Sequence, residues 1–379
     1  MKLPRWRGTL ASDGSKGWIR RILRAVARPA LAVLSILVLL GALELTLRLR
    51  PTLLGREFAN GAQSRYNIGR GGIYYIDPNL GIHFMIPDHS TTMTYNGYTW
   101  HHRTDRLGFR NAALNVPADV LLLGDSMIYG HGVDVEHTVA RELENRTGLT
   151  VANLGHQGDC AFQEAYRLTE NIGRFRPRWV VHVFSPNDIV DLYVHLRDEP
   201  MQRFIATPVE AVTYPPRTDL ATALRQRRQT IRRRSTWQII EQDAYVAKMV
   251  RWLRYEAQAR GWRPGEASAN ASLTAGRTFD RVDVTADTTS LGWRYTEHAI
   301  VYMARLSRRA GARFVMAPVA TEPQFAILQD LARRHALELI DTRSLMRTPS
   351  SFLPNDGHFT PDGARLMADL IAAAVAPKP

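Results

Sequence analysis

Cysteine is almost absent from the chain, since Cys160 is the only one in 379 residues. A disulfide within the chain is therefore excluded, and the redox state of its compartment stays open. The length allows one large domain or two ordinary ones, and 45% hydrophobic with 22% charged residues is a normal globular balance. The chain is long and apolar enough to form a hydrophobic core without disulfide cross-links.

Several motifs of nucleotide-binding and metal-dependent proteins are missing as well. The chain has no GxxxxGK[ST] loop, no GxGxxG and no HExxH. It also lacks the GxSxG elbow of α/β-hydrolases, because Ile128 stands where Ser126 would need its second glycine. The neighbours His101 and His102 have no third ligand at a fixed offset, so we interpret them as surface histidines. We expect no cofactor and no metal.

Acidic residues are scarce near the N-terminus, where Asp13 is the only one in a basic stretch over 1–28. An apolar run follows over 29–49, and its only ionisable side chains are Glu44 and Arg48. A helix of this length can cross roughly 30 Å of hydrocarbon. Because positive charge precedes the run, we predict a cytoplasmic tail and a single-pass anchor in the inner (cytoplasmic) membrane, with the remaining chain extracytoplasmic (periplasmic).

Two other interpretations of the apolar run stay open. Residues 30–43 could be the apolar region of a cleaved signal peptide, although no small-x-small cleavage site follows directly. The run could also be a buried helix of a soluble domain, but the charge asymmetry of its flanks disfavours this.

Residues 50–118 come next and are rich in turn-forming residues, with an Asn96-Gly97 pair typical of a hairpin. We predict a β-rich collar or linker there.

From residue 119 onward, short apolar runs alternate with helical patterns. We expect strands at 120–123, 150–153, 179–184, 313–317 and 337–340. Helices are expected at 136–147, 160–173, 293–310, 322–335 and 361–375. Strands joined by crossover helices predict a three-layer α/β domain with a five-stranded parallel sheet over 119–377.

A helical insertion at about 189–292 interrupts this alternation. Its middle is rich in arginine, namely Arg225, Arg227, Arg228, Arg232, Arg233 and Arg234. The formal charge of +13 raises nucleic acid, anionic lipid and acidic polymer as partners. Because we place this segment outside the cytoplasm, we expect no nucleic acid partner. We interpret the arginines as a solvated basic face, with anionic lipid or an acidic glycan as the alternative.

The groups that serine hydrolysis requires follow the expected strands. Such a reaction needs a nucleophile, a base, a group that orients the base, and donors for the oxyanion. Ser126 follows the first strand, Gly158 the second and Asn187 the third. An imidazole and a carboxylate, His358 and Asp356, stand just before the last helix. By itself, the Gly-Asp-Ser stretch could equally be an ordinary capped turn, because Asp and Ser are common N-caps.

These blocks resemble those of the SGNH (GDSL-type) hydrolases, which centre on Ser, Gly, Asn and His. Here they read Gly124-Asp125-Ser126, NLGHQG with Gly158, SPND with Asn187, and Asp356-Gly357-His358. The stretches GDSMIYGHGVD, VANLGHQG, DGHFTPDGARLMA and RTDRLGFR are also similar to membrane-anchored bacterial members. The resemblance covers about 120–375 without the insertion, and it implies a flavodoxin-like sheet.

The resemblance implies a role for each residue of the blocks. Ser126 is the nucleophile, and its own N–H is an oxyanion donor. The Gly158 N–H and the Asn187 side chain complete the oxyanion hole. His358 is the base, and Asp356 orients it.

Two positions depart from the family pattern. Ser185 stands where the third block usually has glycine, which stiffens the loop and restricts the size of the acyl group. Only Gly357 separates Asp356 from His358, where two residues are usual, and Asn355 holds the usual Asp position. An imidazole can act without a carboxylate, so activity need not depend on Asp356.

We assign no catalytic role to the other polar residues near the blocks. We interpret His131, His137 and His156 as histidines of the substrate cleft or the surface. Asp188 and Asp191 could bind a cation, but we interpret them as structural residues of their loop.

These features together predict an anchored, extracytoplasmic serine esterase or O-acyltransferase. Its expected substrate is an ester-linked acyl group, with acetyl groups on cell-surface polysaccharide favoured. One alternative is a catalytically idle SGNH-like domain that binds glycan or serves in assembly. Another is an esterase for lipids or a thioesterase.

Overall fold

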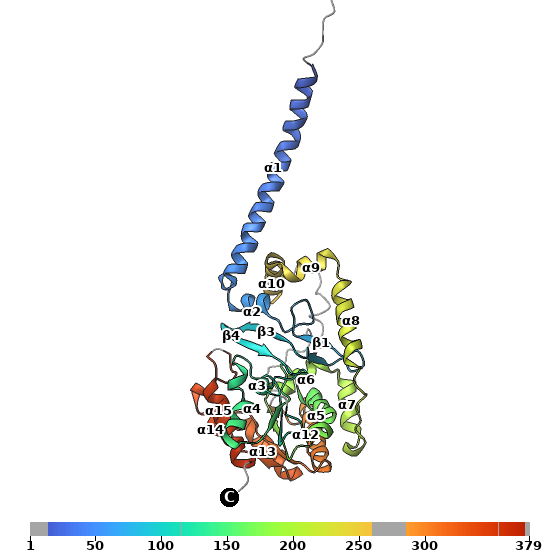
Figure 1. Cartoon of the computed structure of the whole chain (residues 1–379), viewed down its shortest axis with the longest axis vertical. Coiled ribbons are helices and arrows are strands. Elements are labelled where there is room, and N and C mark those ends of the chain that lie inside the picture. The colour runs from blue at the N-terminus through green and yellow to red at the C-terminus, as the bar shows by residue number, and fades with distance from the viewer. Residues whose placement is uncertain (1–13, 114, 260–285, 355, 376–379) are drawn as a thin grey trace, which may run out of the picture. The chain divides into compact units, whose positions relative to one another are not determined.

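The computed structural model describes residues 14–113, 115–259, 286–354 and 356–375 (Figure 1). The chain divides into two compact units, one of residues 1–62 and 235–262 and one of residues 63–234 and 263–379. Asn355 and part of the predicted insertion lie outside the described residues.

The larger unit is built on a parallel sheet of five strands. They are β5 (Val120–Gly124), β6 (Val151–Asn153), β7 (Trp179–Val183), β8 (Arg313–Met316) and β9 (Glu338–Leu339). Their order is β6-β5-β7-β8-β9, so the direction of the connections reverses beside β5. This flavodoxin-like order confirms the predicted fold class, and ligands of such sheets bind at the carboxyl ends near the reversal.

Helices cover both faces of this sheet (Figure 1). Val120 and Leu122 belong to a core shared with α4 (Val139–Thr147) and α15 (Pro361–Val375). Leu121 belongs to the opposite core, which contains residues of α5 (Ala161–Phe175), α12 (Leu291–Arg309) and α13 (Glu322–His335). Because alternate residues of β5 face opposite layers, the strand must be apolar throughout. This explains the uninterrupted run in the sequence.

Shorter elements complete the larger unit. They are α3 (Ser126–Tyr129), η2 (Val135–His137), α6 (Asn187–His195), α7 (Asp198–Ala206), η3 (Val209–Ala211), α8 (Leu220–Arg232), α14 (Arg343–Met346) and η4 (Pro349–Ser351). The described part of the insertion is thus helical, as predicted. Its expected start near residue 189 falls inside α6, whose Ile189 and Leu192 are buried in the core of the α/β domain.

The predicted collar contains two hairpins in the larger unit. β1 (Tyr74–Ile76) pairs with β2 (His83–Met85), and β3 (Ser90–Tyr95) pairs with β4 (Tyr98–Arg103). Asn96 and Gly97 join β3 to β4 with φ of 50° and 86°. Both values suit a two-residue hairpin turn, so this prediction is confirmed.

Arg227 corrects the interpretation of the insertion's arginines as one solvated face. Its Nε donates to the Tyr74 carbonyl at 2.8 Å, and its Nη2 donates to those of Gly69 and Gly72. These contacts make Arg227 a half-buried connection between α8 and the collar, whereas Arg225 on the same helix is exposed.

The smaller unit contains the predicted anchor. It comprises α1 (Gly14–Leu49), η1 (Pro51–Leu54), α2 (Arg56–Gln63), α9 (Thr236–Asp243) and α10 (Tyr245–Ala259). Within α1, Val26–Leu49 is long and apolar enough to cross a membrane. An N-terminal signal sequence would have the same properties.

Arg110 fixes the loop that follows α3. Its buried guanidinium donates to the carbonyls of Tyr129, Val133 and His101, at 3.1, 2.6 and 2.9 Å. A fourth bond reaches the Gly130 carbonyl. One cation therefore satisfies several main-chain oxygens that water does not reach.

We predict that Arg110→Met, which keeps much of the volume, lowers the free energy of unfolding by about 3–5 kcal/mol. Buried carbonyls left without donors cost about 1–3 kcal/mol each, partly recovered by relaxation. Urea unfolding followed by circular dichroism measures the effect, with the exposed Arg106→Met as the control. Equal midpoints for the two variants would contradict this role.

Candidate active site

The short helix α3 presents Ser126 directly after β5. Asp125 caps this helix, because its Oδ1 accepts a hydrogen bond from the Met127 N–H at 2.9 Å. The strand must end in Gly124, since a Cβ there would lie 2.7 Å from Cγ1 of Ile128. The capped turn considered from the sequence is therefore present, and it sets the position of Ser126.

The structure brings Ser126, His358 and Asp356 together. Nε2 of His358 lies 2.8 Å from Oγ of Ser126, and its Nδ1 contacts Oδ1 of Asp356. Gly357 between them has a φ of 84°, in the left-handed region that favours glycine. This turn lets the carboxylate and the imidazole contact each other although only one residue separates them.

Asp356 has a second partner from the collar. Nδ2 of Asn96, in the β3–β4 turn, donates to Oδ2 of Asp356 at 2.7 Å. Burial alone would raise the pKa of Asp356, but the hydrogen bond and charge of His358, together with the Asn96 amide, lower it to about 2. The carboxylate is therefore ionised at neutral pH. Sequence reasoning missed Asn96, which it placed in a turn without a role.

His131 is buried beside the same group, which corrects its interpretation as a cleft or surface residue. Its ring stacks on that of His358 with centroids 4.0 Å apart. Nε2 of Gln157 donates to its Nδ1 at 2.9 Å, so the proton of the neutral ring belongs on Nε2, 3.7 Å from Oδ2 of Asp356. Burial, followed by the charge of His358, lowers the pKa of His131 to about 3. His131 thus stays neutral and faces the carboxylate.

Other histidines also lie differently from their interpretation. His101 and His102 point to opposite faces of β4, and His102 is buried with Nδ1 2.8 Å from the Tyr129 hydroxyl. The pair is therefore neither a surface pair nor a joint ligand set. His156 is buried too, whereas His137 is exposed as expected.

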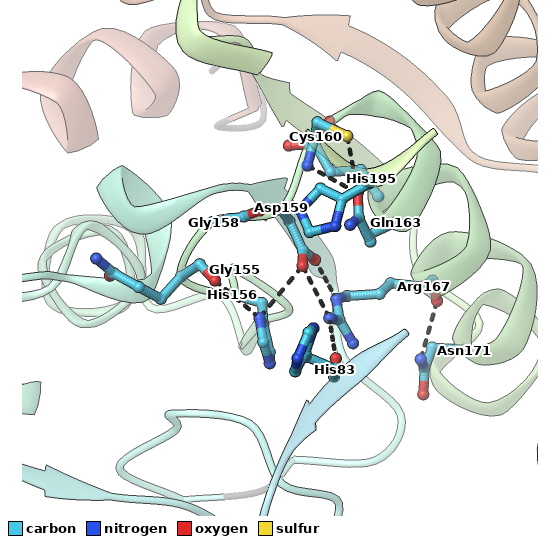
Figure 2. A network of polar contacts seen from close by, with 12 residues as sticks. His83, Gly155, His156, Gly158, Asp159, Cys160, Gln163, Arg167, Asn171 and His195 are labelled. Carbon is cyan, nitrogen blue, oxygen red and sulfur yellow. Dashed lines mark hydrogen bonds and ion pairs between the residues drawn. The ribbon is translucent and has the colours of Figure 1, made fainter. Parts of the chain in front are cut away.

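Gly158 lies in the loop after β6, which a polar network holds in place (Figure 2). Nη2 of Arg167 donates to Oδ1 of the buried Asp159 at 2.9 Å, and Nδ1 of His156 lies 3.2 Å from the same oxygen. Nε2 of His195 lies 3.3 Å from the Gly158 carbonyl. Gly158 has a φ of 75°, and a Cβ there would point into open space. Its backbone conformation, rather than crowding, calls for glycine.

Gly155 in the same loop was missed from the sequence. A Cβ at this position would lie 2.4 Å from the Tyr129 nitrogen and 2.6 Å from the Ile128 carbonyl carbon. The loop after β6 therefore packs directly on the backbone of α3. The two glycines in the sequence NLGHQG could have indicated that this loop packs closely against another backbone segment.

Asn187 is the first residue of α6, and its side chain faces the loop after β5. Its Nδ2 donates to Oδ2 of Asp125 at 3.0 Å and to Oδ2 of Asp191 at 3.1 Å. Ser185 also donates to Asp125, from its Oγ at 3.4 Å. Both N–H groups of the Asn187 amide thus point to carboxylates in this structure. An oxyanion would have to replace one of them.

Two groups of residues in the described part of the chain are close enough to hold a metal ion. They are His131, Asp356 and His358, and the buried Glu164, His182 and Asp188. In the second group, Nε2 of His182 lies 2.8 Å from Oε2 of Glu164. Burial, then the charges of Glu164 and Asp125, raise the pKa of Asp188 well above its usual value. Asp188 also accepts from the Ser185 N–H at 3.0 Å, as expected for a structural loop residue.

We predict that Asn96→Ala lowers kcat for an activated ester about tenfold and leaves KM nearly unchanged. The variant loses one hydrogen bond to a charged acceptor, worth about 1.5 kcal/mol, and frees the carboxylate that orients His358. Release of p-nitrophenol from p-nitrophenyl acetate measures the rate. Thr99→Ala, on the same hairpin, is the control, and an equal kcat in both variants would exclude the positioning role.

The lowered pKa of Asp356 predicts a specific dependence of stability on pH. Its carboxyl group has a usual pKa of 3.8 and a folded pKa of about 2. The ionised group therefore stabilises the fold fully above about pH 4, and this contribution is lost as the pH falls towards about 2. We expect the chain to lose about 2 kcal/mol more than Asp356→Asn over that interval in urea unfolding. If the free energy of unfolding changed with pH by the same amount in both proteins, the lowered pKa of Asp356 would be contradicted.

No family model and no curated protein sequence matches the chain. Similar solved structures include TesA, with 12% identity over 68% of this chain and 96% of that chain and a TM-score of 0.36. A GDSL-like lipase from Bacteroides thetaiotaomicron VPI-5482 has 12% identity, 68% and 86% coverage and a TM-score of 0.33. The lipase/acylhydrolase from Enterococcus faecalis has 16% identity, 68% and 94% coverage and a TM-score of 0.30. At these values, the functional assignment depends on the residues of this chain.

Proposed function

We propose that the chain is a serine esterase of the SGNH (GDSL) type. The observation that carries this proposal is the contact of Ser126 Oγ with Nε2 of His358 at 2.8 Å, with Asp356 on the other ring nitrogen. A hydroxyl, an imidazole and a carboxylate in this arrangement are what a nucleophile, its base and an orienting group require. The place of Ser126 at the carboxyl end of the parallel strand β5 supports the same assignment.

The reaction begins when Ser126 Oγ attacks the carbonyl carbon of an ester. Its proton passes to Nε2 of His358, whose Nδ1–H stays hydrogen-bonded to Asp356 and keeps the ring in place. The same proton then goes to the leaving alcohol as the carbon–oxygen bond breaks. The acyl group stays on Ser126 until water or another hydroxyl attacks it, with His358 again as the base.

The oxyanion that forms in each step requires donors. We assign this role to the N–H groups of Ser126 and Gly158 and to the side chain of Asn187. Asn187 contributes once one of its N–H groups turns from Asp125 or Asp191 towards the substrate. Asp125 keeps its other hydrogen bonds during this change, so the turn after β5 remains in place.

The proposed location of the reaction follows from the N-terminal segment. We propose a basic cytoplasmic tail at 1–28, an anchor at 29–49, a collar at 50–118 and the hydrolase domain at 119–377. Val26–Leu49 is long and apolar enough for the anchor, which supports an extracytoplasmic active site. Acetyl groups on cell-surface polysaccharide are the favoured substrate, and transfer to a sugar hydroxyl is an alternative to hydrolysis.

One observation favours a second candidate, a catalytically idle domain that binds glycan. The Asn187 amide donates to the carboxylates of both Asp125 and Asp191, so the assigned oxyanion donor is engaged. Fluorophosphonate labelling separates the candidates, since the esterase would react at Ser126 and the idle domain would not.

We predict that Ser126→Ala lowers acyl release from p-nitrophenyl acetate by about a thousandfold or more, because the nucleophile is lost. Ser344→Ala, an exposed serine outside the site, is the control. Acetate release from acetylated glycans, with and without an added sugar acceptor, distinguishes hydrolysis from transfer. Equal rates for Ser126→Ala and the unchanged chain would refute the esterase assignment.

A further inference from the structure

Hydrogen bonds in the smaller unit connect the elbow between α9 and α10, which we define as residues 243–246, to the end of α1. The Glu44 carboxylate accepts hydrogen bonds from the N–H groups of Tyr245 and Val246, the first residues of α10, at 3.0 and 2.9 Å. Nη2 of Arg48 donates to the carbonyl of Asp243, the last residue of α9, at 3.0 Å. The elbow therefore lies beside the last two turns of α1.

Apolar packing holds the same helices together. Leu47 near the end of α1 is only 2% exposed and forms a core with Phe58 and Ala62 of α2. One stripe of α10 packs on this core and consists of Tyr245, Val246, Met249 and Trp252. The end of α1 is thus an integrated part of a folded unit, which supports a retained anchor rather than a removable leader.

These contacts determine the depth of the elbow if α1 crosses a membrane. Val26–Leu49 has 24 residues, which correspond to about 36 Å of helix against roughly 30 Å of hydrocarbon. Glu44 lies one to two turns before the end of this segment. The residues that it caps must therefore lie near the boundary between hydrocarbon and headgroups.

Exposed positions of α9 and α10 carry apolar side chains where a helix in water would carry polar ones, and every residue of α9 is exposed. Trp237 is 71% exposed, and Ile240, one turn later on α9, is exposed too. Val250 and Leu253 repeat this i, i+3 spacing on the outer side of α10. The exposed Arg254 follows directly and suits anionic headgroups.

We propose that α9 and α10 lie in the membrane interface beside the point where α1 leaves the bilayer. Their exposed apolar side chains enter the headgroup region, where tryptophan is favoured, while the core-facing stripe of α10 packs on the folded unit. The occupant of this surface is lipid. The proposal rests on the anchor proposed above and is independent of the esterase activity.

Site-specific fluorescence in vesicles tests this placement. The full chain is reconstituted in vesicles of phosphatidylcholine and phosphatidylglycerol, with an NBD label on Trp237→Cys, Leu253→Cys or Leu37→Cys. Cys160 is fully buried, so the chain without an added cysteine should take up no label and serves as the control. Quenching by spin labels in the headgroup or deep in the acyl chain reports depth.

We expect at least twofold stronger quenching of the labels at 237 and 253 by the headgroup spin label than by the deep one. The label at 37, in the middle of the span, should show the reverse order. Quenching at 37 without quenching at 237 or 253 would overturn the interfacial placement and leave the anchor intact. Absence of quenching at all three positions would refute the anchor itself, and neither result bears on Ser126.

Discussion

One buried carboxylate, Asp125, connects the ends of the neighbouring strands β5 and β7. It caps α3 after β5 and accepts hydrogen bonds from Ser185 and Asn187 after β7. The loop that presents Ser126 and the loop that presents Asn187 are therefore both bonded to the same two oxygen atoms.

The carboxyl groups around Ser126 have shifted pKa values. Asp188 lies close enough to Asp125 and Glu164 for their charges, together with burial, to raise its pKa well above the usual value. On the other side of Ser126, Asp356 is held ionised by His358 and Asn96. The pKa values of Asp188 and Asp356 are thus shifted in opposite directions, by desolvation and like charges at the first and by hydrogen bonds and the charge of His358 at the second.

The sequence predicted the parts of this arrangement that depend on local pattern. The apolar run at 120–123 reveals a strand buried on both faces. Ser126 and Asn187 follow two neighbouring strands, and both contact Asp125 because parallel strands end at one edge. The contact of Asn96 with Asp356 could not be predicted, since 260 residues separate them. The burial of His131 could not be predicted from the sequence either. It depends on the packing of the collar over α3 and not on residues close to His131 in the chain.

The collar also helps to fix the geometry of the short Asp356-Gly357-His358 block. With one residue between acid and base, the left-handed Gly357 brings them together but leaves Oδ2 of Asp356 facing the β3–β4 hairpin. Asn96 supplies a donor there, and the hydroxyl of Tyr98 on the same hairpin donates to the Pro354 carbonyl at 3.0 Å. The hairpin thus contacts the block at Asp356 and also contacts Pro354, two residues before it. A domain cut at residue 119 would keep the sheet and Ser126 but lose the contacts that fix the carboxylate.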